Sequence, residues 1–240
     1  KSINLALGVV RHILNVAASE WLDDSGLTWL EHPPKIKLLK VTDARKPYPL
    51  SWDEQTRLFR KLPGHLARMA LFKVNTGCRE QEVCSLRWEW EIEVPELETS
   101  VFLIPEEKVK NGEERLVVLN RVARSIIENV RGEHDTHVFT YCDRRLRRMN
   151  NSAWRRARRK VGLPQVRIHD LKHTFGRRLR AAGVSFEDRQ DLLGHKSGRI
   201  TSHYSAAELG NLIEAANKVA AQGSRKSPAL VVLKKKAASA

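Results

Sequence analysis

The stretch WEWEIEVPELETSVFLIPEEKVKNGEERLVVL, residues 88–119, lies between two parts of the chain that have helical patterns. It begins with WEWEIEV, an alternation of apolar and charged residues that is typical of a half-buried strand. Two short apolar runs follow, VFLIP and RLVVL, and the segment between them holds Asn111-Gly112, a strong signal for a tight turn. We therefore expect a small antiparallel sheet of three strands.

The residues on both sides of this sheet have the apolar spacing of helices. Before the sheet, the expected helices cover residues 2–21, 51–62, 66–75 and 78–88. Ser51 and Glu54 form a capping box at the start of the second helix, and Pro63-Gly64 ends it. After the sheet, helices are expected at residues 120–131, 143–161, 169–182, 185–193, 197–205 and 206–221. The sequence thus predicts a mostly α fold with one small antiparallel sheet, of the α+β class.

A proline- and lysine-rich stretch, HPPKIKLLKVTDARKPYPL at residues 32–50, follows the first helix. Each proline biases the residue before it away from helical geometry, so this stretch is expected to be an extended linker. Residues 1–31 then form a separate unit, and residues 51–221 form the main domain. Residues 222–240 are expected to be a flexible tail, interrupted by the apolar segment ALVVL at 229–233.

The charge of the chain indicates its class of partner. Its 240 residues include 43 Lys and Arg against 28 Asp and Glu, and the net charge of +15 favours a polyanion. No apolar run approaches the ~18 residues that cross a bilayer, so no membrane partner is expected. The cysteines Cys78, Cys84 and Cys142 fit neither a disulfide framework nor a Cys-rich zinc site, which indicates a reducing cytosol.

Positive charge is concentrated in residues 144–160, RRLRRMNNSAWRRARRK, where nine of seventeen residues are Lys or Arg and none is acidic. Such a helix repels itself, because it has no carboxylate with which to form i,i+4 ion pairs. We therefore favour phosphate binding over a purely solubilising role. The predicted DNA contacts are Arg144, Arg145, Arg147, Arg148, Arg155, Arg156, Arg158, Arg159 and Lys160.

Several motifs suit chemistry on a phosphodiester, which needs cations around the phosphate oxygens, a nucleophile and an acid. Tyrosine can serve as a covalent nucleophile when fixed Arg, Lys and His side chains supply the remaining functions without a metal. The candidates are Arg79 and Glu82 in TGCREQEVCSL, Lys110 at the hairpin tip, His169, Lys172 and His173 in HDLKHTF, His195 in LLGH, and Tyr204.

A zinc site is the alternative use of the same histidines. His169 and His173 have the i,i+4 spacing of zinc ligands, but Asp170 stands where an HExxH motif has glutamate. A third ligand would have to be His195 or His203. Such pairs arise readily by chance, so no metal site is predicted.

The order and spacing of these motifs resemble the tyrosine recombinase (phage integrase) family. The resemblance rests on TGCREQEVCSLRW, KNGEERLVVL, HDLKHTFGRRL and LLGHKSGRITSHYS, and it runs from about Ser51 to about Ala207. In the last motif, His195 and Tyr204 have the family's interval of nine residues. The resemblance implies the tyrosine-recombinase catalytic-domain fold, and the cleavage and rejoining of DNA through a 3′-phosphotyrosyl intermediate.

The resemblance also implies a role for each matching residue. Arg79 would hold the scissile phosphate, and Lys110 would give a proton to the departing 5′ oxygen. His169 and His195 would stabilise the phosphorane or assist proton transfer, and Tyr204 would be the nucleophile. The implied catalytic set is Arg79, Lys110, His169, Lys172, His195 and Tyr204, supported by Glu82 and His173.

One position departs from the family pattern, because Lys172 stands where the family has arginine. Lysine keeps the positive charge but replaces a planar fork of donors with a single ammonium. We expect Lys172 still to face the phosphate, with activity retained at an equal or lower rate. The departure also leaves open a degenerate, inactive member of the family.

The resemblance further implies an organisation and a set of partners. Residues 1–31 would be the last helix of a truncated core-binding domain, residues 32–50 the interdomain linker and residues 51–221 the catalytic domain. The expected partners are double-stranded DNA attachment sites and further copies of the chain in a homotetramer, with ALVVL docking in cis or in trans. No cofactor is expected, and the expected location is on DNA in a bacterial cytoplasm.

Two alternatives stay open on the sequence. A type IB topoisomerase would use the same residues and the same intermediate to relax supercoils without pairing two duplexes. A sequence-specific DNA-binding protein that has lost catalysis would use the arginine-rich segment alone, and its binding would weaken with salt without forming an adduct.

Overall fold

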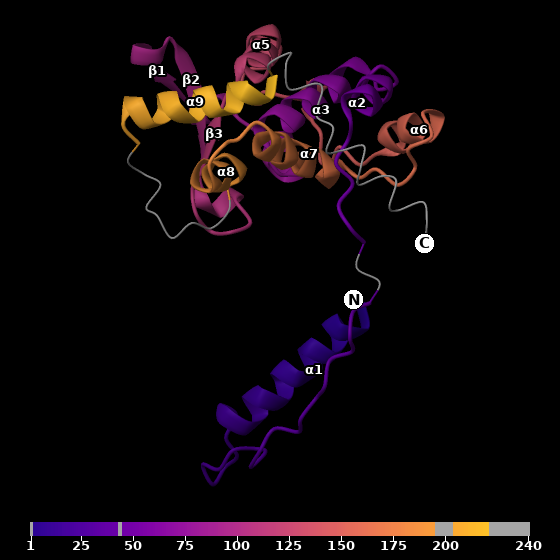
Figure 1. Ribbon diagram of the computed structural model, residues 1–240. Helices are drawn as coiled ribbons and strands as arrows, with labels where there is room; N and C mark the ends of the chain where they lie inside the picture. Colours follow the sequence, from indigo (N-terminus) through magenta and orange to yellow (C-terminus); the bar gives the residue numbers. More distant parts are fainter. Residues whose placement is uncertain (1, 43–44, 195–203, 221–240) are drawn as a thin grey trace. The chain divides into compact units, whose positions relative to one another are not determined.

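The structure of the chain is a computed structural model that describes residues 2–42, 45–194 and 204–220. Contacts divide the chain into two units, Lys1–Lys46 and Pro47–Ala240. Figure 1 shows the elements of both units. All residues of the predicted catalytic set belong to the second unit.

The first unit consists of helix α1, Ser2–Ser19, a turn closed by a bridge between Leu22 and Thr28, and the extended segment after it. Asn4 joins the two, because its side-chain amide donates to the Leu39 carbonyl at 2.7 Å and accepts from the Leu39 N–H at 2.8 Å. Ala17 is the buried residue of α1, and most of the helix's large apolar side chains are exposed. Helix α1 is long and apolar enough to cross a membrane, by length and composition only. Core helices of soluble proteins and signal sequences meet the same criterion, so this is weak evidence for a membrane span.

The second unit is mostly helical, as predicted. Its α-helices are α2 Trp52–Phe59, α3 Gly64–Thr76, α4 Glu80–Cys84, α5 Arg121–Val130, α6 Ser152–Lys160, α7 Ile168–Ala181, α8 Phe186–Leu193 and α9 Ala206–Ala220. The short 3-10 turns are η1 Trp88–Trp90, η2 Pro95–Leu97 and η3 Glu106–Lys108. The predicted capping box of α2 is confirmed, because Ser51 and Glu54 each accept the backbone N–H of the other.

The predicted three-stranded antiparallel sheet is also confirmed. Its strands are β1 Glu91–Val94, β2 Thr99–Ile104 and β3 Arg115–Val118, in the order β1-β2-β3. Phe102 in the central strand pairs with Glu91 on one side and with Val117 on the other. The side chains of Phe102 and Ile104 are fully buried, so one face of the sheet contributes to the main core.

The single helix expected at residues 143–161 is wrong in its first half. The chain there forms a hairpin of two short strands, β4 Thr140–Tyr141 and β5 Arg144–Arg145. Cys142 and Asp143 turn this hairpin with left-handed φ angles of 50° and 58°. Helix α6 begins only after Asn151, whose side chain accepts the N–H of Trp154. Asparagine favours such an N-cap over a helix interior, and this preference sets the start of α6.

Helix α7 lies at the centre of the second unit. It packs against α3, α8 and α9, and α3 packs in turn against α5 and α9 (Figure 1). Leu171 of α7 is buried in the main core, whereas Phe175 and Leu179 are buried in a second cluster with residues of α8 and α9. Arg178 connects α7 to α2, because its guanidinium lies 3.4 Å from the centre of the Trp52 ring. This packing fixes the helix that carries the HDLKHTF motif.

The last residues of the proline-rich stretch are bonded to α7. The N–H of Tyr48 donates to Oδ1 of Asp170 at 3.2 Å, and the N–H of Leu50 donates to Oγ1 of Thr174 at 2.9 Å. Asp170 and Thr174 are buried and lie one helical turn apart, so these bonds pair polar groups inside the protein. Residues 47–50 therefore belong to the second unit, in agreement with the division of contacts after Lys46.

Candidate active site

A left-handed glycine turn positions Arg79 at the start of α4. Gly77 ends α3 with a φ of 66°, and a Cβ at this position would lie 2.8 Å from the Phe175 ring. Both the backbone conformation and the packing therefore require glycine. Arg79 is the N-cap residue of α4, and its N–H donates to Oε2 of Glu82 at 2.6 Å.

The Arg79 guanidinium is held by three acceptors. Its Nη1 donates to Oε1 of Glu82 at 2.7 Å, and its Nη2 donates to Oδ1 of Asn111 at 3.0 Å and to the Gly194 carbonyl at 3.3 Å. The Asn111 amide also donates to the Gly194 carbonyl at 3.4 Å. Sequence reasoning treated Asn111 only as a turn residue and missed this contact. Its place beside Lys110 at the hairpin tip is the signal that could have found it.

Glu82 is a buried carboxylate that two arginines share. Its side chain is 2% exposed, and it pairs with Nη1 of Arg79 at 2.7 Å and with Nε of Arg115 at 3.1 Å. Burial acts to raise the Glu82 pKa, but the Arg115 charge and the hydrogen bonds from Arg79 hold this pKa below its ordinary value. The carboxylate is therefore charged at neutral pH and fixes Arg79. Arg115 lies in the motif KNGEERLVVL, but no role was predicted for it.

Three successive carbonyls at the C-terminal end of α8 accept hydrogen bonds from cationic side chains. The carbonyls of residues 192–194 accept, in order, from Arg115, Lys172 and Arg79. The last carbonyls of a helix lack donors within the helix and carry the negative end of its dipole, so cations are stable there. The end of α8 thus gathers basic side chains from β3, from α7 and from the start of α4.

Lys172 has a strongly perturbed pKa. The residue is 6% exposed, and burial, together with the charges of Arg115 and Arg79, lowers the pKa of its ammonium to about 6. Glu82 opposes this shift without cancelling it. In the protein alone, Lys172 is therefore mostly uncharged at neutral pH, and an anion placed beside it would restore its charge.

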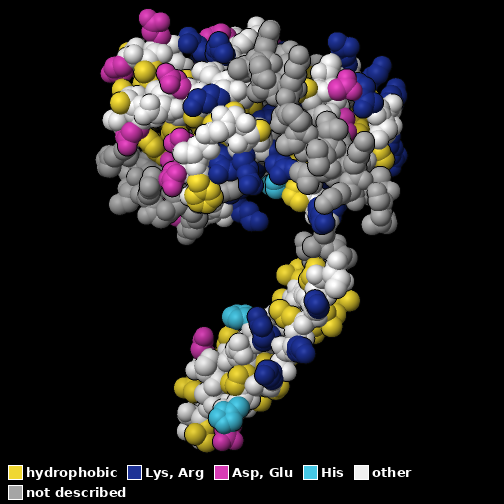
Figure 2. Space-filling model, viewed as in Figure 1, with side chains coloured by type: hydrophobic (Ala, Val, Ile, Leu, Met, Phe, Trp, Pro, Cys, Tyr) yellow, Lys and Arg dark blue, Asp and Glu magenta, His cyan; other side chains and the backbone are white. Residues whose placement is uncertain are grey.

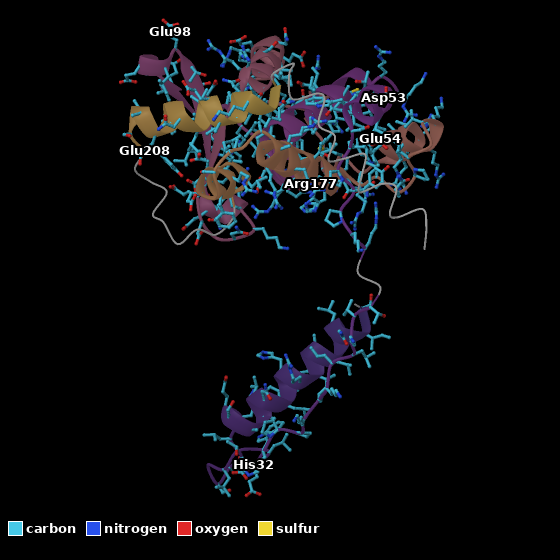
Figure 3. The ribbon with its side chains drawn as sticks, viewed as in Figure 1. His32, Asp53, Glu54, Glu98, Arg177 and Glu208 are labelled. Carbon is cyan, nitrogen blue, oxygen red and sulfur yellow. The ribbon has the colours of Figure 1, made fainter. Side chains whose placement is uncertain are left out.

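The two histidines of HDLKHTF lie side by side on α7. The ring centres of His169 and His173 are 4.7 Å apart in an edge-to-face arrangement. Desolvation lowers the pKa of both rings, and His173, Lys73 and Lys172 lower the pKa of His169 further. Both histidines and Lys172 line a cleft of about 490 Å³. The cleft is completed by Pro47, Pro49, Gly176, Arg177 (labelled on α7 in Figure 3), Arg180, Arg189 and Leu193.

A second buried lysine supports the turn that carries Arg79. Lys73 of α3 has no exposed surface, and its ammonium donates to the carbonyl of Cys78, the residue before Arg79. Burial lowers the Lys73 pKa to about 8, although Cys78 and Glu82 oppose the shift. No pattern in the sequence indicated this role, because a lysine within an apolar helix usually points to solvent.

The site contains more positive than negative charge. Among the described residues, Lys73, Arg79 and Arg115 converge here with Lys172, which a bound anion would charge, and Glu82 is the carboxylate that pairs with the two arginines. Figure 2 shows Lys and Arg side chains and a histidine gathered near α7 and α8 on this face. Cations grouped inside a protein are unfavourable unless an anion compensates them, so the geometry suits a bound phosphate group.

Two further residues of the predicted catalytic set, Lys110 and His195, are sequence neighbours of residues that bond the Arg79 guanidinium. Lys110 is exposed and directly precedes Asn111, which bonds Arg79. His195 directly follows Gly194, whose carbonyl accepts from Arg79, but His195 itself lies outside the described residues.

Tyr204 precedes α9 and does not lie within a helix. The helix expected at residues 197–205 falls mostly outside the described residues, and its last two members, Tyr204 and Ser205, are not helical. The N–H and hydroxyl of Ser205 each donate to Oε2 of Glu208 at 2.8 Å, which fixes the start of α9 (Figure 3). The half-buried Tyr204 ring packs against two hydrophobic clusters, and Leu116 of β3 packs against the same two.

A known protein family matches the part of the chain that contains the predicted catalytic set. The phage integrase family matches residues 53–209, which is more than half of the chain. The chain belongs to the phage integrase family. The matched range includes every residue of the predicted catalytic set, from Arg79 to Tyr204.

This phage integrase family member has named relatives. It is 26% identical over 226 residues to the integrase of Salmonella phage P22, covering 89% of the chain and 56% of that protein. It is 25% identical to the shufflon-specific DNA recombinase of Escherichia coli, covering 88% of the chain and 52% of that protein. The chain thus spans about half the length of the curated relatives it matches.

A solved structure confirms the predicted tyrosine-recombinase catalytic-domain fold for this family member. The lambda integrase tetramer bound to a Holliday junction matches with a TM-score of 0.55 and 16% sequence identity. The match covers 85% of this chain and 60% of the lambda chain. At this identity, the likeness concerns the fold alone.

The predicted DNA contacts of this integrase-family chain lie on β5, on α6 and between them. The exposed members are Arg144, Arg145, Arg147, Arg148, Arg155, Arg156, Arg159 and Lys160. Arg158 differs, because it is half-buried and its Nη1 donates to the Val166 carbonyl at 2.6 Å. Oε1 of Glu80 accepts the N–H groups of Met149 and Asn150 at 2.7 and 2.8 Å, which ties this segment to α4 beside Arg79.

The alternative zinc site was tested by looking for groups of side chains that could bind a metal ion in the described part of the chain. No group of three or more His, Cys, Asp or Glu side chains there could hold a metal ion. Among the described residues, His169 and His173 therefore have no third side chain with which to bind a metal ion. The neighbouring positive charge of Lys73 would also repel such an ion.

Proposed function

We propose that this chain carries the catalytic domain of a site-specific DNA recombinase that cleaves and rejoins strands through a 3′-phosphotyrosyl intermediate. The observation that carries the proposal is the convergence of Arg79, Arg115 and Lys172 at the end of α8, beside the charged Glu82. A phosphodiester is the anion that this group suits. The names of the P22 integrase and the shufflon-specific DNA recombinase support DNA as the substrate.

The proposed chemistry assigns one task to each side chain. Arg79 and Lys172 bind the non-bridging oxygens of the scissile phosphate, and Glu82 orients Arg79. The Tyr204 hydroxyl gives its proton to the uncharged His169 ring and attacks phosphorus, and the bond from phosphorus to the 5′ oxygen breaks as Lys110 gives that oxygen a proton. The reverse attack by a 5′ hydroxyl of a partner strand releases Tyr204 and rejoins the DNA.

The histidines complete this proposal. His169 lies beside the cleft and its pKa is lowered, so at neutral pH the ring is uncharged and can accept a proton as well as donate a hydrogen bond. His195, which follows Gly194 in the sequence, is proposed to stabilise the phosphorane or to assist proton transfer. His173 packs on His169 and limits its ring orientation.

The proposed partners are double-stranded DNA and further copies of the chain, with the protein bound to DNA in a bacterial cytoplasm. The exposed arginines of β5 and α6 support backbone contacts with DNA, since they can neutralise phosphates without reading bases. The lambda integrase structure, a tetramer on a Holliday junction, supports a tetramer as the working assembly. The segment ALVVL, proposed to dock on the same or a neighbouring copy, lies outside the described residues.

The test is a nicked suicide DNA substrate that carries the protein's own attachment site. Cleavage releases a short strand beyond the nick and traps the covalent adduct, which migrates slowly in a denaturing gel. We expect an adduct with the native chain and none with Tyr204→Phe. An adduct that persists in Tyr204→Phe, or its absence with a native chain that binds the site, would overturn the proposal.

A further inference from the structure

Arg115 is a buried residue of the site to which the proposed chemistry gives no task. It begins β3, its side chain is 1% exposed, and it is not among the residues that line the cleft. A buried guanidinium is unfavourable unless its surroundings compensate the charge. The contacts of Arg115 therefore indicate what the residue does.

The Arg115 guanidinium joins three segments that meet at the site. Its Nε lies 3.1 Å from Oε2 of Glu82 in α4. Its Nη2 donates to the carbonyl of Thr76, the last residue of α3, at 3.4 Å, and to the carbonyl of Leu192 in α8 at 3.2 Å. One planar group thus connects the turn before Arg79, the carboxylate that orients Arg79, and the end of α8.

The fourth contact of Arg115 is with the backbone of Gly194. A Cβ on Gly194 would lie 1.6 Å from Nη1 and 2.7 Å from Cζ of Arg115, a position that no side chain can occupy. Gly194 also has a left-handed φ of 56°, which glycine adopts without strain. Nη1 is buried and has no hydrogen-bond acceptor among the described residues, so it packs directly against this glycine.

We propose that Arg115 is a positioning residue for the strand-cleavage step, acting through Glu82 and Gly194 on Arg79. This inference rests on the proposed function. Two of the acceptors that hold the Arg79 guanidinium are the Glu82 carboxylate and the Gly194 carbonyl, and Arg115 contacts both residues. Moving Arg115 would therefore move both at once.

The expected effect follows from the geometry. Arg115 is 1% exposed, so its loss leaves in place the exposed arginines of β5 and α6 that are proposed to contact the DNA backbone. A displacement of about 1 Å at a reacting group costs on the order of 100-fold in rate. We therefore expect the rate of cleavage to fall while the affinity for DNA stays nearly constant, a division that a merely structural role would not produce.

The experiment measures single-turnover adduct formation on the suicide substrate, the DNA dissociation constant and thermal unfolding for each variant. Arg115→Lys keeps the charge and loses the planar contacts, and Gly194→Ala displaces the guanidinium. We expect each to slow cleavage by roughly 100-fold with the dissociation constant changed by less than about 3-fold. The matched control is Arg124→Ala, an exposed arginine paired with Glu128, which is expected to cleave at the native rate.

Chemical rescue adds a readout that separates position from stability. Methylguanidinium can occupy the space left in Arg115→Ala, so it is expected to restore cleavage by at least ~10-fold over sodium chloride at equal ionic strength. Native-rate cleavage by Arg115→Lys, unfolding of that variant, or equal losses of rate and affinity would each overturn the inference. A native chain that binds DNA but forms no adduct would instead overturn the proposed function, which distinguishes the two failures.

Discussion

Replacing Lys172 by arginine should remove a pH dependence of DNA binding that native Lys172 creates. The pKa of Lys172 is about 6 in the protein alone, against an ordinary 10.5 for lysine. A phosphate about 4 Å away stabilises the ammonium by ~4 kcal/mol at an effective dielectric constant near 20. At 1.36 kcal/mol per pKa unit, this raises the pKa by about 3 units, to about 9 in the complex.

The direction of the effect follows from these two values. DNA favours the protonated ammonium, so binding takes up a proton between pH ~6 and ~9, and affinity is lost as the pH rises through this window. From pH 6.5 to 8.5, the dissociation constant should rise by about 60-fold through Lys172 alone. Arginine stays charged throughout, so Lys172→Arg should lack this component and bind more tightly at high pH.

The assay measures DNA affinity from pH 6.5 to 8.5 at constant ionic strength, in a Tyr204→Phe background that prevents cleavage. Lys73, with a pKa of about 8, titrates in the same window, so the informative quantity is the difference in pH slope between chains with and without Lys172→Arg. Identical pH slopes for the two would refute the reasoning.

In a cleavage-competent chain, Lys172→Arg should match or exceed the native rate of cleavage, and Lys172→Ala should cleave much more slowly. Equal rates in all three would show that this position has no catalytic task.

Three other predictions follow from the described contacts. Glu82→Gln should destabilise the chain by about 3–5 kcal/mol in urea unfolding, because it leaves buried arginine charge uncompensated, and a loss below ~1 kcal/mol would contradict the buried ion pair. Thr174→Val should cost about 1–3 kcal/mol, since the buried N–H of Leu50 loses its acceptor, and unchanged stability would show that this bond contributes nothing. Arg155→Ala should lower the slope of log affinity against log salt by ~0.9. The Arg158 guanidinium bonds within the protein, so Arg158→Ala should lower stability without changing that slope. Equal slopes for the two variants would count against α6 as a phosphate contact.

The elements of the fold were largely predictable because their signals are local. The period-two pattern before Val94 and the Asn111-Gly112 turn predicted the sheet, and the capping box at Ser51 predicted the start of α2. The arginine-rich segment was mispredicted, because a run of like charges carries no apolar periodicity. Its course is set by the turn at Cys142 and the cap at Asn151, which compete with helix formation locally.

The buried residues that support the site were less predictable from the sequence than the residues of its motifs. Arg79, Glu82 and Lys172 stand in recognisable motifs, and the structure brings them together at the end of α8. Lys73 stands in a segment that shows only the pattern of a helix. Arg115 stands in KNGEERLVVL, where the pattern predicts a turn and a strand but no role for the arginine. Their positions depend on which elements pack together, and that information lies in contacts between residues far apart in the chain.

The bonds from residues 47–50 to α7 bear on how the catalytic part of such a protein can be isolated. A shortened chain that starts at Ser51 would leave Thr174 and Asp170 without the N–H donors of Leu50 and Tyr48, and it would expose the apolar surface that Leu50 covers. Both buried acceptors lie on the helix that carries His169 and Lys172. For expression, proteolytic trimming or fusion to another DNA-binding module, the junction therefore belongs before Pro47.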